Sequence, residues 1–382
     1  MAKASSRSAL PAGAIDVPAD GSLVHRGPLI VGGWALGADG PATDVLVVVD
    51  GREAAGATVG AARPDVATLH PGIPNAERSG WEARIDVSRV QGPGATLVLL
   101  ARAREDDWTE LDRCDIRVDA PGAYAARPRA VFTIAQNESR FLPLWLRHYG
   151  RHFEPSDIYV LDHDSTDGST AALGDSCHVV PVHCDRIFDQ MWLTGTVENF
   201  QSFLLRSYAA VLYAEVDEFV VPDASRYPDL GAYIDQLREP AATCTGYNVV
   251  HHPDEGEPPL RFDEPVLRQR RYWYPSRKYS KRLLGRVPLS WNVGFHEEFN
   301  APTTRPDPDL YLIHLHRVDY DYCLARHRRA ASGNWNQEDL QFNLTWHQRV
   351  VEPDEFRTWF YEGEDLDGAA PEVIPDRVRD LL

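Results

Sequence analysis

The sequence of 382 residues lacks long apolar runs, and its basic residues are outnumbered. No stretch of about 18 consecutive apolar residues occurs, the length that a helix needs to cross a bilayer. The first twenty residues also lack the apolar core of a signal peptide. Lys and Arg number 39 against 57 Asp and Glu, a net charge of −18. Because nucleic-acid binding needs a basic surface, this charge excludes nucleic acid as the main partner. We expect a chain that neither spans a membrane nor is exported.

Cysteine is scarce and shows no pairing pattern. The five cysteines are odd in number and include no Cys-x-x-Cys pair. This usage excludes a disulfide framework and a structural zinc site of the common spacing, and it is typical of reduced thiols. We therefore expect a cytoplasmic protein.

The composition is that of an ordinary globular protein, with 43% hydrophobic residues, 10 Trp and 15 Tyr. The length predicts two or three domains. Composition shifts divide the chain into a flexible leader (1–20), an all-β domain (21–120), a Pro- and Ala-rich linker (121–129), a second folded domain (130–364) and a polar C-terminal tail (365–382).

Short apolar runs separated by turn residues fill the region from about Leu23 to Val118. Examples are Pro28–Leu36 and Asp44–Val49, the latter followed by Asp-Gly. Runs of this length with Asp-Gly and Gly breaks are typical of hairpins. We expect a small sandwich-like β domain.

From Ala130 the pattern changes to strands that alternate with helices. The expected strands are Ala130–Ala135, Asp157–Leu161 and Ala209–Ala214, and the expected helices begin near Ser139 and at Val197. In the first helix Phe141, Trp145 and Tyr149 share one face. Alternating strands and helices predict an α/β fold with a mostly parallel sheet flanked by helices, whose ligands bind beyond the carboxyl ends of the strands.

Two acidic clusters follow two of these strands. In the first, Asp162 and Asp164 are placed to bind a base or ribose, or else they form a turn and a helix cap. In the second, Glu215 and Asp217 are two residues apart and face the same side if the backbone is extended. Adjacent carboxylates repel unless a cation lies between them, so we expect Mg²⁺ or Mn²⁺ there; a solvated edge is the alternative.

Basic and histidine residues gather further along the chain. A stretch without acids supplies candidate phosphate ligands, with a solvated hairpin or a single-strand nucleic-acid groove as alternatives: Arg268, Arg270, Arg271, Arg277, Lys278, Lys281, Arg282 and Arg286. Beyond it, His296, Glu297 and Glu298 stand together as possible acid–base groups. His314 and His316 alternate as in a strand, so both would face one side, where they could complete a metal site or simply pack.

Three segments in order resemble bacterial glycosyltransferases of the family-two-like group, whose fold is called GT-A. They are Thr133–Glu138 before an apolar helix, the acidic run 161–169, and Glu215–Phe219. The resemblance spans about residues 128–330. The β domain, with its Gly-Gly-Trp-Ala-Leu-Gly segment from Gly32, looks like an accessory domain found beside some bacterial sugar transferases.

The resemblance implies roles for individual residues. Donor-binding residues would be Ala135, Glu138, Asp162, Asp164, Lys278, Lys281, Arg282 and His296. Metal ligands would be Glu215, Asp217, His314 and His316, where Glu215 replaces the family's usual first Asp of an Asp-x-Asp motif. The general base would be Glu297, with Glu298 and Glu218 as rivals.

The expected function is a metal-dependent glycosyltransferase that moves a sugar from a UDP- or GDP-linked donor to a glycan or other hydroxyl acceptor, with inversion. A sugar nucleotidyltransferase is one alternative, but residues 130–140 contain no Gly for a phosphate loop. A non-catalytic glycan-binding protein is the other.

Overall fold

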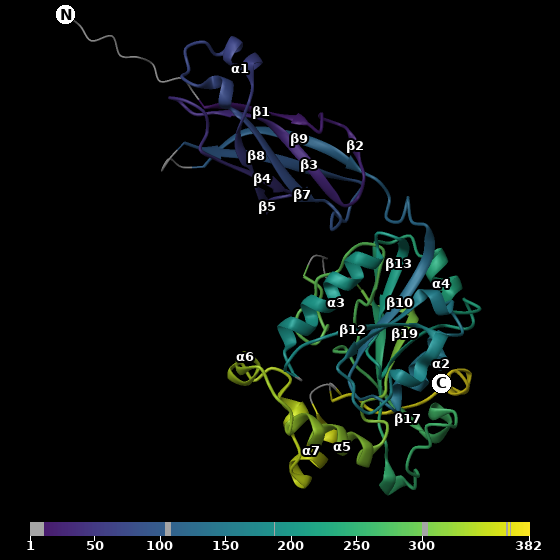
Figure 1. Cartoon of the computed structure of the whole chain (residues 1–382). Helices are drawn as coiled ribbons and strands as arrows, with labels where there is room; N and C mark the ends of the chain where they lie inside the picture. The colour runs from purple at the N-terminus through teal and green to yellow at the C-terminus, as the bar shows by residue number, and fades with distance from the viewer. Residues whose placement is uncertain (1–10, 104–107, 187, 300–304, 364–365, 367) are drawn as a thin grey trace, which may run out of the picture. The chain divides into compact units, whose positions relative to one another are not determined.

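The chain folds as two compact units, residues 1–123 and 124–382 (Figure 1). The computed structural model describes residues 11–103, 108–186, 188–299, 305–363, 366 and 368–382. Half of the expected leader, residues 1–10, lies outside the described residues. The other half is ordered, because strand β1 begins at Ala12 and its Ile15 packs into the first core. None of the five cysteines, all in the described part, is in a disulfide.

The first unit consists of two β-sheets that enclose one apolar core. One sheet has the order β1 (Ala12–Val17), β3 (Pro28–Leu36), β7 (Gly80–Asp86) and β6 (Thr58–Ala61). The other has the order β2 (Leu23–Val24), β9 (Thr109–Val118), β8 (Gly94–Arg102), β4 (Asp44–Val49) and β5 (Arg52–Gly56). The pairs are antiparallel except β2 with β9. Alternate residues of β8 are buried, as expected for strands with one face on a core. A short helix, α1 (Pro64–Leu69), follows β6.

The first sheet of the second unit is mixed. Its order is β12 (His178–Val182), β11 (Ile158–His163), β10 (Arg127–Ala135), β13 (Tyr208–Tyr213), β18 (Leu284–Gly285) and β15 (Ala241–Ala242). The first four strands run parallel, and β18 is antiparallel to both of its neighbours.

The second sheet of this unit is mostly antiparallel. Its order is β14 (Glu218–Pro222), β19 (Asp307–His314), β16 (Cys244–Val249), β17 (Tyr272–Pro275) and β20 (Glu372–Val373). Only β16 and β19 pair in parallel.

The fold class predicted for the second unit, a GT-A-type mostly parallel sheet flanked by helices, is therefore wrong. The chain contains several sheets, most of their strand pairs antiparallel. The decisive point lies after β13, where only the four residues 214–217 precede β14. A parallel crossover needs a dozen or more residues. Strand β14 consequently leaves the first sheet and pairs antiparallel with β19.

Seven helices of the described residues complete the second unit: α2 (Phe141–Tyr149), α3 (Gln190–Leu204), α4 (Leu230–Gln236), α5 (Tyr320–Ala331), α6 (Gln337–Gln341), α7 (Pro353–Glu362) and α8 (Asp376–Arg379). In α2 the predicted apolar face is buried. Helix α3 begins earlier than expected because Asp189 caps it, accepting a hydrogen bond from the Trp192 backbone at 3.0 Å. Among the described helices, none combines the length and apolar character that crossing a membrane requires.

The buried histidine of α2 makes a test of acid sensitivity possible. His148 is 4% exposed, and its Nε2 lies 3.1 Å from the Val220 carbonyl oxygen. Burial lowers the pKa of His148 from 6.5 to about 3. Below pH 6.5 the imidazole takes up a proton in the unfolded chain, while His148 of the folded protein stays neutral. The free energy of unfolding is therefore not reduced by this residue above pH 6.5, and it falls as the pH decreases from 6.5 toward 3.

We expect His148→Gln to weaken the pH dependence of the unfolding free energy between pH 6.5 and 4 by about 1.4 kcal/mol per pH unit. Urea unfolding followed by circular dichroism across this range measures it. The exposed His178→Gln serves as the control and should keep the original slope. An unchanged slope in His148→Gln would contradict the assignment of a neutral buried imidazole.

Candidate functional site

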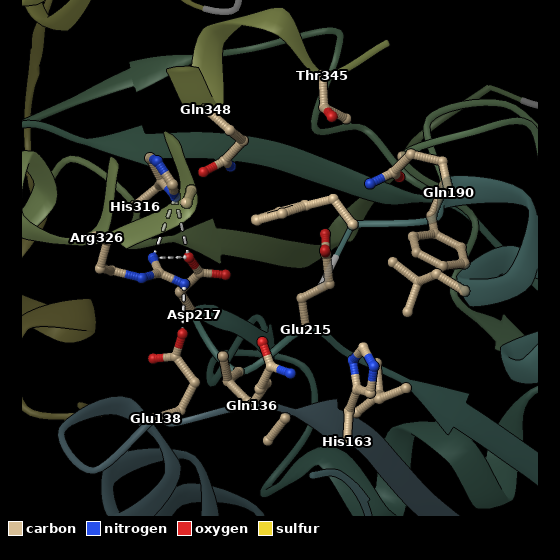
Figure 2. Close-up of a pocket in the computed structure, with 18 of the residues that line it drawn as sticks. Gln136, Glu138, His163, Gln190, Glu215, Asp217, His316, Arg326, Thr345 and Gln348 are labelled. Carbon is tan, nitrogen blue, oxygen red and sulfur yellow. Dashed lines mark hydrogen bonds and ion pairs between the residues drawn. The ribbon is translucent and has the colours of Figure 1, made fainter. Parts of the chain in front are cut away.

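A cavity of about 270 Å³ lies in the second unit where strands β10, β11 and β13 end (Figure 2). Ala135 and His163 line it from the ends of β10 and β11, and Glu215 and Asp217 line it from the loop after β13. His314, the last residue of β19, contributes from the second sheet. The carboxyl ends of parallel strands are where α/β sheets bind ligands.

The second acidic cluster forms a turn instead of an extended strand. The backbone N–H of Glu218 donates to the Glu215 carbonyl oxygen at 2.9 Å. We predicted that Glu215 and Asp217 face the same side on the assumption that the backbone is extended. Because the backbone forms a turn here, that prediction does not hold. The two carboxylates have different cationic partners as a result, Lys281 for Glu215 and Arg326 for Asp217.

Asp217 is the buried acid of the cavity, with a side chain 7% exposed. Arg326 Nη1 donates to its Oδ2 at 2.6 Å, and His316 Nδ1 lies 3.2 Å from the same oxygen. Burial alone would raise the pKa of Asp217, but neighbouring positive charge, above all that of Arg326, outweighs it and holds the pKa well below its usual range. Asp217 is therefore an anion whose charge must be balanced locally.

Asp217, His314 and His316 are arranged as a metal site could be. One ligand atom from each lies within 4.8 Å of the others. The two rings are nearly parallel, 5.7 Å apart between centroids, and His314 Nε2 is 3.9 Å from Asp217 Oδ1. Burial lowers the pKa of His314 well below its usual value, so the ring is neutral and able to bind a cation. This donor set fits a divalent metal ion.

Glu215 belongs to a separate ionic cluster. Lys281, 1% exposed, places its Nζ 2.8 Å from Glu215 Oε2 and 2.7 Å from Glu218 Oε1. Burial raises the pKa of Glu218 to about 8, with Lys281 opposing the rise and Glu215 adding to it. The Glu215 side chain is 35% exposed and borders the cavity, whereas Glu218 is fully buried. The sequence-predicted pairing of Glu215 with Asp217 is thus not seen.

The first acidic cluster forms a turn, the alternative that the sequence left open. Asp162 accepts from the Ser165 backbone at 3.0 Å and from the Thr170 hydroxyl at 2.9 Å. Asp164 pairs with His183 at 2.6 Å. Neither of these two described residues lines the cavity; His163 between them does, with its ring 4.8 Å from that of Trp192.

The other predicted donor-binding residues are divided between the cavity and its surroundings. Ala135, Glu138, Lys281 and His296 line the cavity. Lys278 and Arg282, both described, do not: the Lys278 carbonyl oxygen lies 2.9 Å from His296 Nδ1, and the Arg282 side chain lies 3.9 Å from Glu298.

None of the three predicted general bases, all in the described part of the chain, lines the cavity. Glu218 is held by Lys281. Glu298 is buried beside Arg282 and Ser290. Glu297 is exposed, and its Oε2 accepts from the Asn292 side chain at 3.4 Å.

Several cavity residues carry no signal in the sequence. Arg326 links the two ends of the site, because Nη2 donates to Glu138 at 3.0 Å while Nη1 binds Asp217 (Figure 2). Its 13% exposed side chain comes from α5, which was not among the helices predicted from the sequence. The C-terminal segment contributes Thr345, His347 and Gln348. These residues lie far along the chain from the strand ends of the cavity, so no local sequence pattern links them to the site.

Comparisons with known proteins do not identify a family. The sequence matches no protein-family model and no curated protein. Solved structures similar to part of the chain include an endo-beta-1,4-mannanase from Thermotoga petrophila (10% identity, 29% of this chain, 19% of that chain, TM-score 0.20). Others are the Ig1-2 module of Drosophila receptor protein tyrosine phosphatase DLAR (13%, 34%, 61%, 0.19) and the SrpA adhesin of Streptococcus sanguinis (9%, 35%, 70%, 0.22). The chain spans about a fifth of the mannanase and less than two thirds of the DLAR module. TM-scores this low support no conclusion about fold or activity.

A glycine behind the site provides a test of its packing. A Cβ on Gly246, in β16, would overlap the backbone of Tyr279 and Ser280. The Tyr279 ring stacks on His314 at 3.9 Å between centroids, so any shift of this backbone reaches the metal-site candidate.

We expect Gly246→Ala to lower the free energy of unfolding by about 1–3 kcal/mol, the usual effect of overpacking, as measured by urea unfolding. Gly195→Ala in α3 is the matched control: nothing lies within 4 Å of its Cβ position, and replacing a helical glycine stabilises by about 0.5–1 kcal/mol. Equal stability of the two variants would contradict the close approach at Gly246.

Proposed function

We propose that the cavity binds a divalent cation together with a nucleotide diphosphate sugar, and that the protein transfers the sugar to a hydroxyl acceptor with inversion at the anomeric centre. One observation carries the proposal: the carboxylate of Asp217 and the rings of His314 and His316 converge at the cavity beside Arg326. The ordered motifs in the sequence add the expectation of a sugar nucleotide as the donor.

The metal would be held by Asp217, His314 and His316. Imidazole ligands favour transition metals, whereas Mg²⁺ prefers an all-oxygen set, so this donor set favours Mn²⁺ over Mg²⁺. When bound, the metal would stabilise negative charge on the leaving diphosphate. Metal binding requires Arg326 Nη1 to give up the contact that now neutralises Asp217.

The charges around the cavity support a cation and a diphosphate that enter together. Four acids line it (Glu138, Asp189, Glu215 and Asp217) against three bases (Lys281, Arg326 and Arg329). A diphosphate alone would add negative charge to a lining that already has one acid in excess. A divalent ion offsets that addition, and Arg329, 47% exposed, remains able to contact phosphate oxygens.

The nucleobase is assigned to the His163 side of the cavity. The rings of His163 and Trp192, 4.8 Å apart and tilted by 38°, form an aromatic wall there, and Gln190 also lines the cavity. Aromatic faces of this kind stack on bases regardless of sequence.

The proposed partners are a UDP- or GDP-linked donor and a glycan or other hydroxyl acceptor. The proposed location is the cytoplasm.

The general base is assigned to Glu215, in place of the three acids that the sequence suggested. Its carboxylate borders the cavity, is 35% exposed and is oriented by Lys281. It is also absent from the group of ligand atoms around Asp217 among the described residues. A base must reach the acceptor hydroxyl, and exposure to the cavity satisfies that condition.

Asp217→Asn tests the metal role. The substitution removes the one charged ligand, so we expect Mn²⁺-dependent release of nucleotide from the donor to fall by about 100-fold or more. Nucleotide release from a panel of UDP-, GDP- and dTDP-sugars measures it. Asp235→Asn, a surface acid paired with Arg129, is the control and should retain the activity. Full turnover of the unmodified protein after chelation of divalent metal would rule out this mechanism.

Glu215→Gln separates the base from the metal ligands. We expect sugar transfer to fall by about 100-fold or more, the usual contribution of a general base, while the Mn²⁺ dissociation constant changes less than about threefold. Isothermal titration with Mn²⁺ and a transfer assay together measure both. If Mn²⁺ affinity falls as steeply as in Asp217→Asn, the two acids share the ion and the base assignment is wrong.

The products distinguish the two other functions that the sequence left open. Release of pyrophosphate from a nucleoside triphosphate and a sugar phosphate would identify a nucleotidyltransferase. No turnover of any donor, combined with glycan binding, would identify a binding protein. Both outcomes contradict sugar transfer.

A further inference from the structure

We propose that Asn248 and His327 are positioning residues, which hold His314 and His316 in the tautomers whose unprotonated nitrogens face Asp217. The inference rests on the proposed metal-dependent function and names the residues that would set its metal affinity. Neither residue lines the cavity, and both are buried in the described core.

The orientation of His314 follows from its outer hydrogen bond. His314 Nδ1 lies 2.6 Å from Asn248 Oδ1, which is on the neighbouring strand β16. A carbonyl oxygen only accepts, so the Nδ1 of His314 carries the proton. The other nitrogen, Nε2, is then unprotonated, and it is the atom that lies 3.9 Å from Asp217.

The tautomer of His316 is determined from the buried end of a chain of hydrogen bonds. At the cavity end, Arg326 Nη1 lies 3.2 Å from His316 Nδ1. A guanidinium only donates and would make Nδ1 an acceptor, but the Asp217 carboxylate, which only accepts, also lies 3.2 Å from Nδ1, so the cavity end alone fits either tautomer. At the buried end, His327 Nδ1 lies 3.1 Å from the Val350 carbonyl oxygen and must donate to it.

The buried end assigns the link between the two rings. His327 carries its proton on Nδ1, so its Nε2 accepts from His316 Nε2–H at 3.1 Å. Every proton in the chain is thereby assigned once, and the unprotonated Nδ1 of His316 faces Asp217. Outer partners of this kind orient metal-binding imidazoles and raise their basicity.

A second arrangement of the same residues makes a different prediction. His316, Cys323 and His327 also have ligand atoms within 4.8 Å of one another, so a metal could replace the proton between the two rings. The hydrogen-bond chain predicts one Mn²⁺ or Zn²⁺ ion per protein chain, whereas metal at both places requires two. Metal analysis after dialysis against each ion distinguishes them, and two ions would overturn the proposal.

Two pairs of variants test the positioning roles through the Mn²⁺ dissociation constant, measured by electron paramagnetic resonance of free Mn²⁺. His327→Phe keeps the ring shape but removes the acceptor, and Asn248→Leu does the same for His314. We expect each to weaken Mn²⁺ binding by 10- to 100-fold. His327→Gln and Asn248→Asp each retain an acceptor oxygen and should stay within about fivefold of the original affinity.

A spectroscopic measurement detects the tautomers directly and does not depend on folding stability. In protein labelled with ¹⁵N-histidine and free of metal, we expect His314 protonated on Nδ1 and His316 on Nε2, with the His316 pattern lost in His327→Phe. The opposite tautomers, or equal Mn²⁺ affinity in the Phe and Gln variants, would overturn the proposal. The control His148→Gln should leave both measurements unchanged. If the unmodified protein binds no Mn²⁺ while the tautomers are as expected, the proposed metal function fails and the hydrogen-bond chain stands.

Discussion

The burial of the Asp217 carboxylate is the constraint on which the site depends. An anion removed from water needs a cation and hydrogen bonds close by, because isolated charges are strongly disfavoured in a protein interior. Arg326 supplies the cation, reaching Asp217 at 2.6 Å while its other nitrogen holds Glu138. The guanidinium therefore joins the loop after β13 to the loop after β10, and α5 is tied to the end of the first sheet.

The remaining charges are arranged in compensated groups around this one. Lys281 pairs with Glu215, and burial raises the pKa of Glu218 to about 8, so the three acids of the turn are not all charged at neutral pH. The turn itself separates the carboxylates that an extended strand would have placed together. Its four-residue connection also sends β14 into the second sheet, which brings β19 and its terminal His314 to the cavity. One short loop thus influences both the strand order and which side chains reach the cavity.

Local patterns predicted the elements with good accuracy where one face is buried. The expected strands Pro28–Leu36 and Asp44–Val49 have the observed bounds, because alternating burial and Gly turns are read within a few residues. The amphipathic face of α2 and the motif around Asp217 were equally visible. The partner of each strand in its sheet was not visible in the sequence, because the residue pattern of a strand does not show whether its neighbour runs parallel or antiparallel.

The sequence by itself indicated the β-rich character of the first unit, the strands β10, β11 and β13 and the helix α2, and it showed that acids follow β11 and β13. The tertiary structure alone decided which of them meet. Arg326 lies 109 residues from Asp217, and His316 is 99 residues from it, so their contacts depend on how two sheets and α5 pack. Asp162 and Asp164 illustrate the converse, because Asp162 accepts hydrogen bonds from donors of its own loop and Asp164 pairs with His183 beyond β12. Burial and partner choice are properties of the folded chain, and a pattern of residue types does not contain them.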